Sequence, residues 1–291
     1  MCGWLEGSAR WHQLGPAELV LTAAVARRHY LHHRSKVQIA EELGISRFKV
    51  ARMLDAAREM GLVRIEIVRQ GTLDLDLSAH VLQEVVTARD VIGLPWSRTV
   101  HAVVGALESL PPVEVVQLTG AIVLPDFDSS AVDIVRRASR LADGTSRVFY
   151  APFVLDDAAS AEALRRQPPV AEGLARASSV TIAVVGIGGW APGESTIHDL
   201  LGAEERDALA QAGVVGELAG IFFDRQGRVC RPAVTARLIT IGEADLRRIR
   251  EVIAVVSGAA KQDAVRAALR GGLVHSLVTD AELARTLLDH S

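Results

Sequence analysis

Residues 90–278 repeat one pattern: a short apolar stretch, then a loop of glycine and polar residues, then an amphipathic stretch of helical length. Short apolar strands that alternate with helices are typical of a parallel β-sheet covered by helices on both faces. The pattern therefore predicts an α/β fold for most of the chain. The predicted strands are 90–94, 113–118, 147–150, 180–186, 252–256 and 273–278, and the predicted helices are 98–109, 130–142, 158–166, 203–212 and 260–270.

Length and charge predict two domains. A chain of 291 residues suits a small domain joined to a larger one. Residues 1–70 carry 11 Lys and Arg against 7 Asp and Glu, which leaves 21 against 28 in residues 71–291. A basic head on an acidic body is typical of a polyanion-binding domain attached to a domain with another task. We expect the division at residue 70, followed by a linker helix within 73–89.

The basic segment has the signals of three helices. Ser35 and Ser46 each suit the N-cap of a following helix, and Gly44 between those helices can adopt the left-handed conformation of a tight turn. The arrangement predicts a helix-turn-helix. Residues 62–68 alternate in part like a strand, which favours a winged variant. The predicted helices are 17–30, 36–43 and 47–60.

The second helix of this pair carries a basic outer face. Arg47 and Arg52 suit bidentate contacts with guanine, and Lys49 suits a phosphate, because the start of a recognition helix meets base edges and backbone. The alternative is a basic helix face exposed only to solvent. The predicted contacts with double-stranded operator DNA are Ser35, Ser46, Arg47, Phe48, Lys49 and Arg52.

Several predicted strands of the larger domain end in loops of small residues. Such loops offer free backbone N–H groups and helix starts, which can hold a phosphate. Lys261 is the only lysine after Lys49 and follows a glycine turn, so it suits the counter-ion of an anionic ligand. Two alternatives stay open: glycine is common at any strand-to-helix turn, and Lys261 can be a surface residue. The loops are 95–99, 119–121, 186–189 and 257–261.

The sequence predicts no cofactor, no metal site and no enzymatic activity. Trp190 and Pro192 follow the glycine run where a dinucleotide fingerprint needs a helix, and there is no Walker A sequence. Cys2 and Cys230 have no metal-like spacing. The polar cluster 194–199 offers no assignable pair of base and orienting group. No apolar run reaches the length of a membrane span and the N-terminus lacks a signal peptide, so we expect a cytoplasmic protein.

Short stretches along nearly the whole chain carry a family resemblance. In them the chain resembles the SorC/DeoR-type bacterial sugar-binding transcriptional regulators. The matching stretches are 38–46 (QIAEELGIS), 57–63 (AREMGLV), 116–120 (VQLTG), 185–188 (VGIG), 213–217 (GVVGE), 223–224 (FD) with Gly227, 252–255 (VIAV), 267–272 (AALRGG) and 277–280 (LVTD).

The resemblance implies a C-terminal effector domain that is similar to sugar-phosphate isomerases but is used for binding. It also implies a homodimer or homotetramer and control of carbohydrate catabolic genes. Ser97 and Ala121 stand where the family usually has glycine, which implies an altered pocket. Some members bind an aldehyde sugar through a lysine Schiff base, but we expect noncovalent binding here. The effector residues carried over are Trp96, Ser97, Thr119, Gly120, Ala121, Gly186, Gly188, His198, Glu217, Gly258 and Lys261.

Together these observations predict a transcriptional regulator of carbohydrate catabolism. Its affinity for operator DNA is expected to depend on a phosphorylated sugar or polyol, or an unphosphorylated sugar, bound in residues 71–291. Two alternatives remain at this point. One is a sugar-phosphate isomerase-like enzyme with an appended DNA-binding head, and the other is a regulator whose pocket is vestigial.

Overall fold

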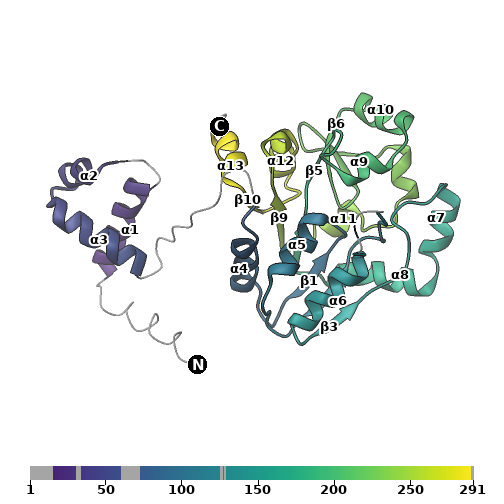
Figure 1. Ribbon diagram of the computed structural model, residues 1–291, viewed down its shortest axis with the longest axis horizontal. Helices are drawn as coiled ribbons and strands as arrows, with labels where there is room; N and C mark the ends of the chain where they lie inside the picture. The colour runs from purple at the N-terminus through teal and green to yellow at the C-terminus, as the bar shows by residue number, and fades with distance from the viewer. Residues whose placement is uncertain (1–15, 31–33, 60–72, 125–126, 128, 290–291) are drawn as a thin grey trace. The chain divides into compact units, whose positions relative to one another are not determined.

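The chain divides into two compact units, Met1–Ile67 and Val68–Ser291. The computed structural model describes residues 16–30, 34–59, 73–124, 127 and 129–289, which Figure 1 draws in colour. The predicted strand at 62–68 and the predicted domain boundary after residue 70 lie outside these residues.

The smaller unit contains three helices, α1 (Pro16–Tyr30), α2 (Lys36–Leu43) and α3 (Arg47–Glu59). A reciprocal capping box starts α2: the Gln38 N–H donates to Ser35 Oγ over 3.2 Å, and the Ser35 N–H donates to Gln38 Oε1 over 2.9 Å. Gly44 ends α2 at φ 63°, a left-handed conformation that glycine adopts without strain. The helices pack around a common core of Val25, Ala26, Ile39, Ala40, Val50, Met53, Leu54 and Ala57.

The larger unit is built on a six-stranded parallel sheet in the order β10-β9-β4-β1-β2-β3. The chain enters at β1, proceeds to one edge through β2 and β3, and then returns to build the other side from β4 outward. The order of the strands therefore reverses between β1 and β4. The strands are β1 (Val91–Leu94), β2 (Glu114–Gln117), β3 (Thr145–Arg147), β4 (Ile182–Val185), β9 (Glu251–Val256) and β10 (Ser276–Thr279).

Two layers of helices cover this sheet, and the strands alternate between them. On β9, Ile253 and Val255 belong to one core, while Val252 and Ala254 belong to the other. Because both faces are buried, β1 and β4 contain only apolar residues and glycine, and β9 is apolar after Glu251. The first core also contains residues of α4 (Leu75–Val85), α5 (Arg98–Ala106) and α6 (Ala131–Leu141), and the second contains residues of α11 (Glu243–Leu246), α12 (Gln262–Arg270) and α13 (Ala281–Leu288) (Figure 1).

The structure differs from the sequence prediction at β3 and in a whole second sheet. The strand predicted at 147–150 is β3 at Thr145–Arg147, because the Phe149 N–H donates to the side chain of Gln117 instead of a backbone carbonyl of β2. A second sheet, which is antiparallel and was not predicted, has the order β5-β6-β7-β8. Its strands are β5 (Gly188–Gly189), β6 (Val214–Leu218), β7 (Ile221–Asp224) and β8 (Val229–Cys230).

Four further helices connect these strands. Of these, α7 and α10 agree with predicted helices, whereas α8 and α9 were not predicted. Their bounds are α7 (Ala158–Arg165), α8 (Pro168–Ala175), α9 (Thr196–Leu200) and α10 (Ala203–Gln211). Among the described residues, no helix is both long and apolar enough to span a bilayer.

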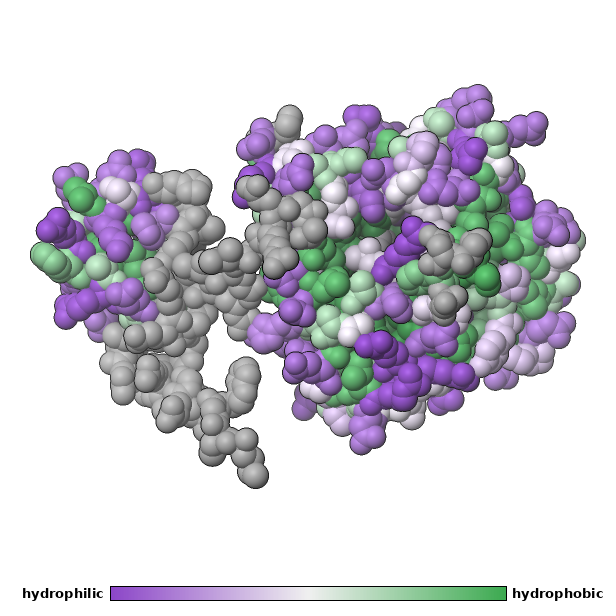
Figure 2. Space-filling model, in the orientation of Figure 1, coloured by the Kyte–Doolittle hydropathy of each residue, from purple (hydrophilic) through white to green (hydrophobic). Residues whose placement is uncertain are grey.

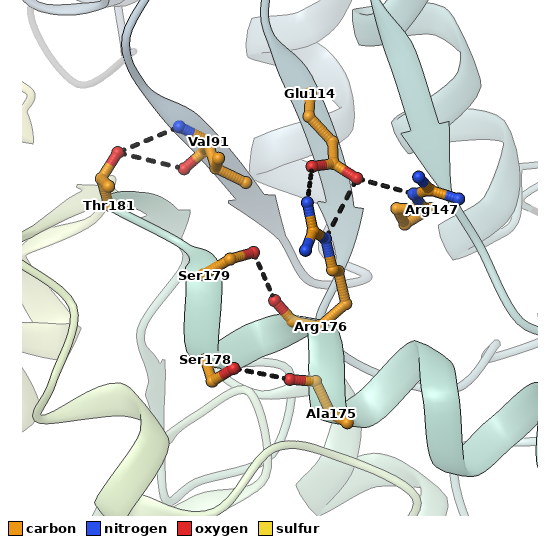
Figure 3. Close-up of polar contacts among 8 residues, drawn as sticks. All are labelled: Val91, Glu114, Arg147, Ala175, Arg176, Ser178, Ser179 and Thr181. Carbon is orange, nitrogen blue, oxygen red and sulfur yellow. Dashed lines mark hydrogen bonds and ion pairs between the residues drawn. The ribbon is translucent and has the colours of Figure 1, made fainter.

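Charged side chains stabilise the sheet near the amino ends of β1, β2, β4 and β9. Figure 3 shows Glu114, the first residue of β2, between Arg147 at the end of β3 and Arg176. Hydrogen bonds from Arg176 hold the pKa of Glu114 below its usual value. Asp90, just before β1, accepts from Thr181 and pairs with Arg250 over 2.8 Å. Because these carboxylates are paired with protein groups, we assign them a role in stabilising the sheet.

Candidate functional site

A cavity opens at the other end of the sheet, beside the carboxyl ends of β1 and β4. These two strands are neighbours, and the strand order reverses between them, which is where ligands bind in open α/β sheets. The cavity is open to solvent and has a volume of about 230 Å³. Seven of the predicted effector residues line it: Trp96, Ser97, Thr119, Gly186, Gly188, Glu217 and Lys261.

The wall after β1 is held by hydrogen bonds between two loops. The Trp96 backbone N–H donates to Thr119 Oγ1 over 2.8 Å, and the Trp96 indole N–H donates to the Ser129 carbonyl over 3.0 Å. Ser97 caps α5 by accepting from the Val100 N–H over 3.3 Å. A Cβ added at Gly186 would lie 2.7 Å from Ser97 Oγ, so the loops after β1 and β4 approach closely.

A buried carboxylate also lines the cavity. Glu217 on β6 is 7 % exposed and accepts hydrogen bonds from the Ser195 hydroxyl over 2.8 Å and the Gly220 N–H over 3.3 Å. Burial raises the pKa of Glu217, although these hydrogen bonds and the charge of Lys261 oppose the rise. The site therefore contains an acidic group whose proton is held more tightly than that of an ordinary glutamate.

The short strand β5 explains how Glu217 reaches the loop after β4. Gly188 pairs with Glu217 across the antiparallel ladder between β5 and β6. A Cβ at Gly188 would lie 2.6 Å from the Cβ of Ser195 and would also meet the Glu217 carboxylate. Glycine is therefore required at position 188 by this close approach.

A second acidic group, Asp199 on α9, lines the same cavity. It accepts from the Gly193 N–H over 3.1 Å and contacts His198 Nδ1 over 3.1 Å. Burial opposes the ionisation of Asp199, but the hydrogen bonds from His198 and Gly193 keep its pKa below the usual value. His198 itself is buried beside Trp190, with 5.1 Å between the ring centroids, and does not line the cavity. His198 therefore contacts Asp199 from outside the cavity lining.

Two cationic side chains also line the cavity, Arg98 in the first turn of α5 and Lys261 just before α12. The cavity wall thus offers carboxylates that can accept from ligand hydroxyl groups and cations that can donate to a ligand oxyanion. Of these residues, Lys261 is a predicted effector contact, whereas Arg98, Ser195 and Asp199 appear in the sequence prediction only as members of the stretches 95–99 and 194–199. For Ser195, the signal in the sequence was its suitability as the N-cap of a helix that begins at Thr196.

Three other predicted effector residues support the cavity from outside its lining. The Gly120 N–H donates to the Ile239 carbonyl over 2.8 Å, and the Ala121 N–H donates to the Ala151 carbonyl over 2.8 Å. The Gly258 N–H donates to the buried carboxylate of Asp280 over 2.7 Å. These amides already have protein acceptors and so are not available to a ligand.

The polar cluster around Ser195 lacks the arrangement of a nucleophilic site. Although its hydroxyl donates to Glu217, Ser195 Oγ also accepts from the Ile197 N–H over 3.1 Å and the His198 N–H over 3.3 Å. Both lone pairs are therefore used in capping α9, which makes this oxygen a poor nucleophile. No group of three His, Cys, Asp or Glu residues that could hold a metal is present in the described parts of the chain.

The predicted DNA contacts lie at the starts of α2 and α3. Ser46 Oγ accepts from the Lys49 N–H over 3.2 Å, so Ser35 and Ser46 both act as N-caps. Arg47, Phe48 and Arg52 are exposed and Lys49 is half-buried. The structure thus brings three cationic side chains and one aromatic ring to the surface near the start of α3.

Comparisons with known proteins agree with this architecture. Residues 36–289 match the family model described as "Putative sugar-binding domain". The deoxyribonucleoside regulator of Bacillus subtilis is 26 % identical over 92 % of this chain and 97 % of its own length. The sorbitol operon regulator of Klebsiella pneumoniae is 26 % identical over 93 % of this chain and 98 % of its own length.

A crystal structure of the full-length regulator from Klebsiella pneumoniae has a similar fold. It superposes with a TM-score of 0.69 at 23 % identity and covers 94 % of this chain and 99 % of that chain. The family model covers most of the sequence, including α2, α3 and every strand of both sheets. This chain therefore belongs to the SorC/DeoR-type family of sugar-binding transcriptional regulators.

Proposed function

We propose that this protein is a DNA-binding regulator of carbohydrate catabolism, that residues 1–70 bind the operator, and that residues 71–291 bind a phosphorylated sugar or polyol. The observation that carries the proposal is the cavity at the strand-order reversal, with carboxylates and cations on its wall, in a chain that also presents a basic helix. Binding of the effector changes the affinity for the operator. The protein acts in the cytoplasm as a regulator and not as an enzyme.

The DNA-binding half of the proposal is supported by α2, Gly44 and α3. The left-handed Gly44 produces a tight turn between the two helices, as in a helix-turn-helix. The second helix then presents Arg47 and Arg52 for base edges and Lys49 for a phosphate. A homodimer or homotetramer would bind two such half-sites, so the operator is expected to be partly palindromic.

Substitution of the two arginines tests this half. Arg47→Ala and Arg52→Ala together should abolish binding of the full chain to its own promoter DNA, measured by fluorescence anisotropy. Arg89→Ala, a cation outside α3, is the matched control and should bind like wild type. Circular dichroism should be unchanged in both variants, because all three side chains are exposed. Promoter binding by the double variant with wild-type affinity would rule out the assignment.

The effector half is supported by the chemistry of the cavity wall. Glu217 and Asp199 can accept hydrogen bonds from the hydroxyl groups of a sugar or polyol. Arg98 and Lys261 can bind a phosphate, and Arg98 lies in the first turn of α5, where backbone N–H groups favour an anion. Noncovalent binding fits these groups without any Schiff base.

A thermal-shift screen with matched pairs of sugars and their phosphates tests the effector half. The phosphorylated member of the correct pair should raise the Tm of wild type more than the free sugar does, and Lys261→Ala should lose this difference. Arg270→Ala, an exposed cation at the end of α12, should keep it. If phosphorylated compounds stabilise neither wild type nor variant, the effector is not a sugar phosphate.

A further inference from the structure

Phe48 in the first turn of α3 presents an aromatic ring to solvent. It is 70 % exposed, and the other large hydrophobic side chain exposed in the described part of the smaller unit is Val37 on α2, at 51 %. Figure 2 shows a few hydrophobic residues among hydrophilic ones on the visible surface of this unit. Removal of an apolar ring from water is favourable. An exposed ring beside the predicted DNA contacts is therefore expected to be covered by a partner.

The surroundings of Phe48 specify the chemistry of the partner. The Arg47 guanidinium lies over the ring, 5.0 Å from its centroid. Arg52 is exposed on the next turn of the same helix. An apolar protein groove over Phe48 would have to remove water from these cations without neutralising them, which is unfavourable. A partner that carries an apolar group between negative charges satisfies both the ring and the cations.

The major groove of DNA has this combination. The C5-methyl group of thymine is the apolar group that bases display there, and phosphates flank the groove on both sides. Ser46 fixes the first turn of α3 by accepting from the Lys49 N–H and, through its carbonyl, from the Val50 N–H over 3.1 Å. The ring is therefore held at the helix end that enters the groove in a helix-turn-helix.

We infer that Phe48 recognises a thymine by contact with its C5-methyl group, beside the base that Arg47 binds. The inference rests on the proposed operator binding. The contact with the Phe48 ring holds the Arg47 guanidinium in place before DNA is bound, so that the two side chains act as one reading unit. Arg47 then reads a guanine and Phe48 reads an adjacent thymine.

Deoxyuridine tests this inference, because it differs from thymidine only by the absence of that methyl group. The full-length protein first selects duplexes from a randomised pool. The tightest duplex is then synthesised with each thymidine replaced in turn by deoxyuridine. At one position in each half-site, the replacement should weaken binding of wild type by about fourfold, the factor expected for one buried carbon group.

Two variants separate the methyl contact from other effects. Phe48→Ala should bind the thymidine and deoxyuridine duplexes equally at that position. Val37→Ala, the matched exposed apolar residue on α2, should keep the full fourfold difference.

The possible results separate the methyl contact from the proposed operator binding. Equal binding of wild type to every deoxyuridine duplex, with loss of binding on Arg47→Ala, would overturn the methyl contact and leave the operator proposal intact. A uniform weakening of Phe48→Ala on all duplexes, with the deoxyuridine effect retained, would also overturn it. Failure to select any duplex would overturn both this inference and the proposed function.

Discussion

Glu217 is a carboxylate that the fold holds in its protonated form over a wider pH range than a free glutamate. Burial in the wall of the cavity raises its pKa, while Ser195, the Gly220 N–H and Lys261 act in the opposite direction. Below the pKa of the unfolded chain, both states bind the proton equally. As the pH rises from there to the folded pKa, only the unfolded state loses the proton, so the free energy of unfolding falls.

Glu217→Gln should remove this fall in the free energy of unfolding with rising pH. The free energy of unfolding of the variant, minus that of wild type, is expected to increase as the pH rises above about 4.5, because the Gln side chain does not titrate. Urea denaturation at pH 5, 6.5 and 8 measures this difference. Other titrating groups cancel in the subtraction, and a difference that stays constant with pH would contradict the prediction.

Ser195→Ala provides a control of opposite sign. Without the Ser195 hydroxyl, a hydrogen bond that favours the ionised carboxylate is lost, so the folded pKa of Glu217 rises further. The free energy of unfolding of this variant, minus that of wild type, should therefore decrease with rising pH. A general loss of packing would not make the difference in free energy of unfolding rise with pH in one variant and fall with pH in the other.

At the scale of elements, Asp280 joins α13 to a loop at the cavity. Its Oδ1 caps α13 by accepting from the Glu282 and Leu283 N–H groups, and its Oδ2 accepts from the Gly258 N–H. Burial opposes the ionisation of Asp280, yet these hydrogen bonds keep its pKa below the usual value. The loop that precedes Lys261 is thus anchored by a charge on the last helix.

Asp280→Asn separates these two tasks. Asparagine is a good N-cap, but its NH₂ group would face the Gly258 N–H and leave that donor unpaired. The expected loss is about 1–3 kcal/mol in the free energy of unfolding, measured by urea denaturation at pH 7. Asp157→Asn, an exposed N-cap of α7, should lose less because water replaces the carboxylate. Equal losses would show that the link to Gly258 adds no stability.

The turn between α2 and α3 gives a second prediction for an element. Gly44→Ala introduces no steric clash, because no atom lies within 4 Å of the new Cβ, but it forces alanine to φ 63°. The left-handed conformation costs about 1–2 kcal/mol for a residue with a side chain. Thermal unfolding followed by circular dichroism should show this loss. An unchanged Tm would mean that the turn in the variant adopts another conformation at position 44 without loss of stability.

The elements also show what the sequence can predict. The positions of β1, β4 and β9 follow from apolar runs that are buried on both faces, and α2 and α3 follow from their serine caps. In the antiparallel sheet, β6 and β7 are largely apolar stretches joined by a two-residue turn, a local hairpin signal that was missed. The strand β5 has only two residues, both glycine, and exists through its pairing with Glu217 on β6. Such a long-range pairing leaves no periodic pattern in the local sequence.

The same limit applies to the candidate site. The predicted loops 95–99 and 186–189, which follow β1 and β4, contribute residues to the lining of the cavity. Composition could not show that the N–H groups of Gly120 and Ala121 pair with Ile239 and Ala151, which are distant in sequence. His198 is a related case, since its buried position beside Trp190 depends on the packing of α9.

At the scale of the whole molecule, the proposed function makes a thermodynamic prediction. If effector and operator bind to different sites and influence each other, the coupling free energy must be the same in both directions. The factor by which the effector changes operator affinity should therefore equal the factor by which saturating operator DNA changes effector affinity. Calorimetric titrations of the full chain, with and without the second ligand, measure both. Unequal factors would indicate that a further equilibrium, such as assembly, takes part.

The position of the cavity at the strand-order reversal has a consequence for protein engineering. Part of its wall comes from loops that leave separate strands, and the sheet beneath them is held by its own backbone ladders and by the ion pairs at the opposite end. One loop can therefore be redesigned without altering strand registration. A biosensor for a new small molecule could be built by randomising residues 95–99 and screening with a reporter gene, with α3 kept unchanged.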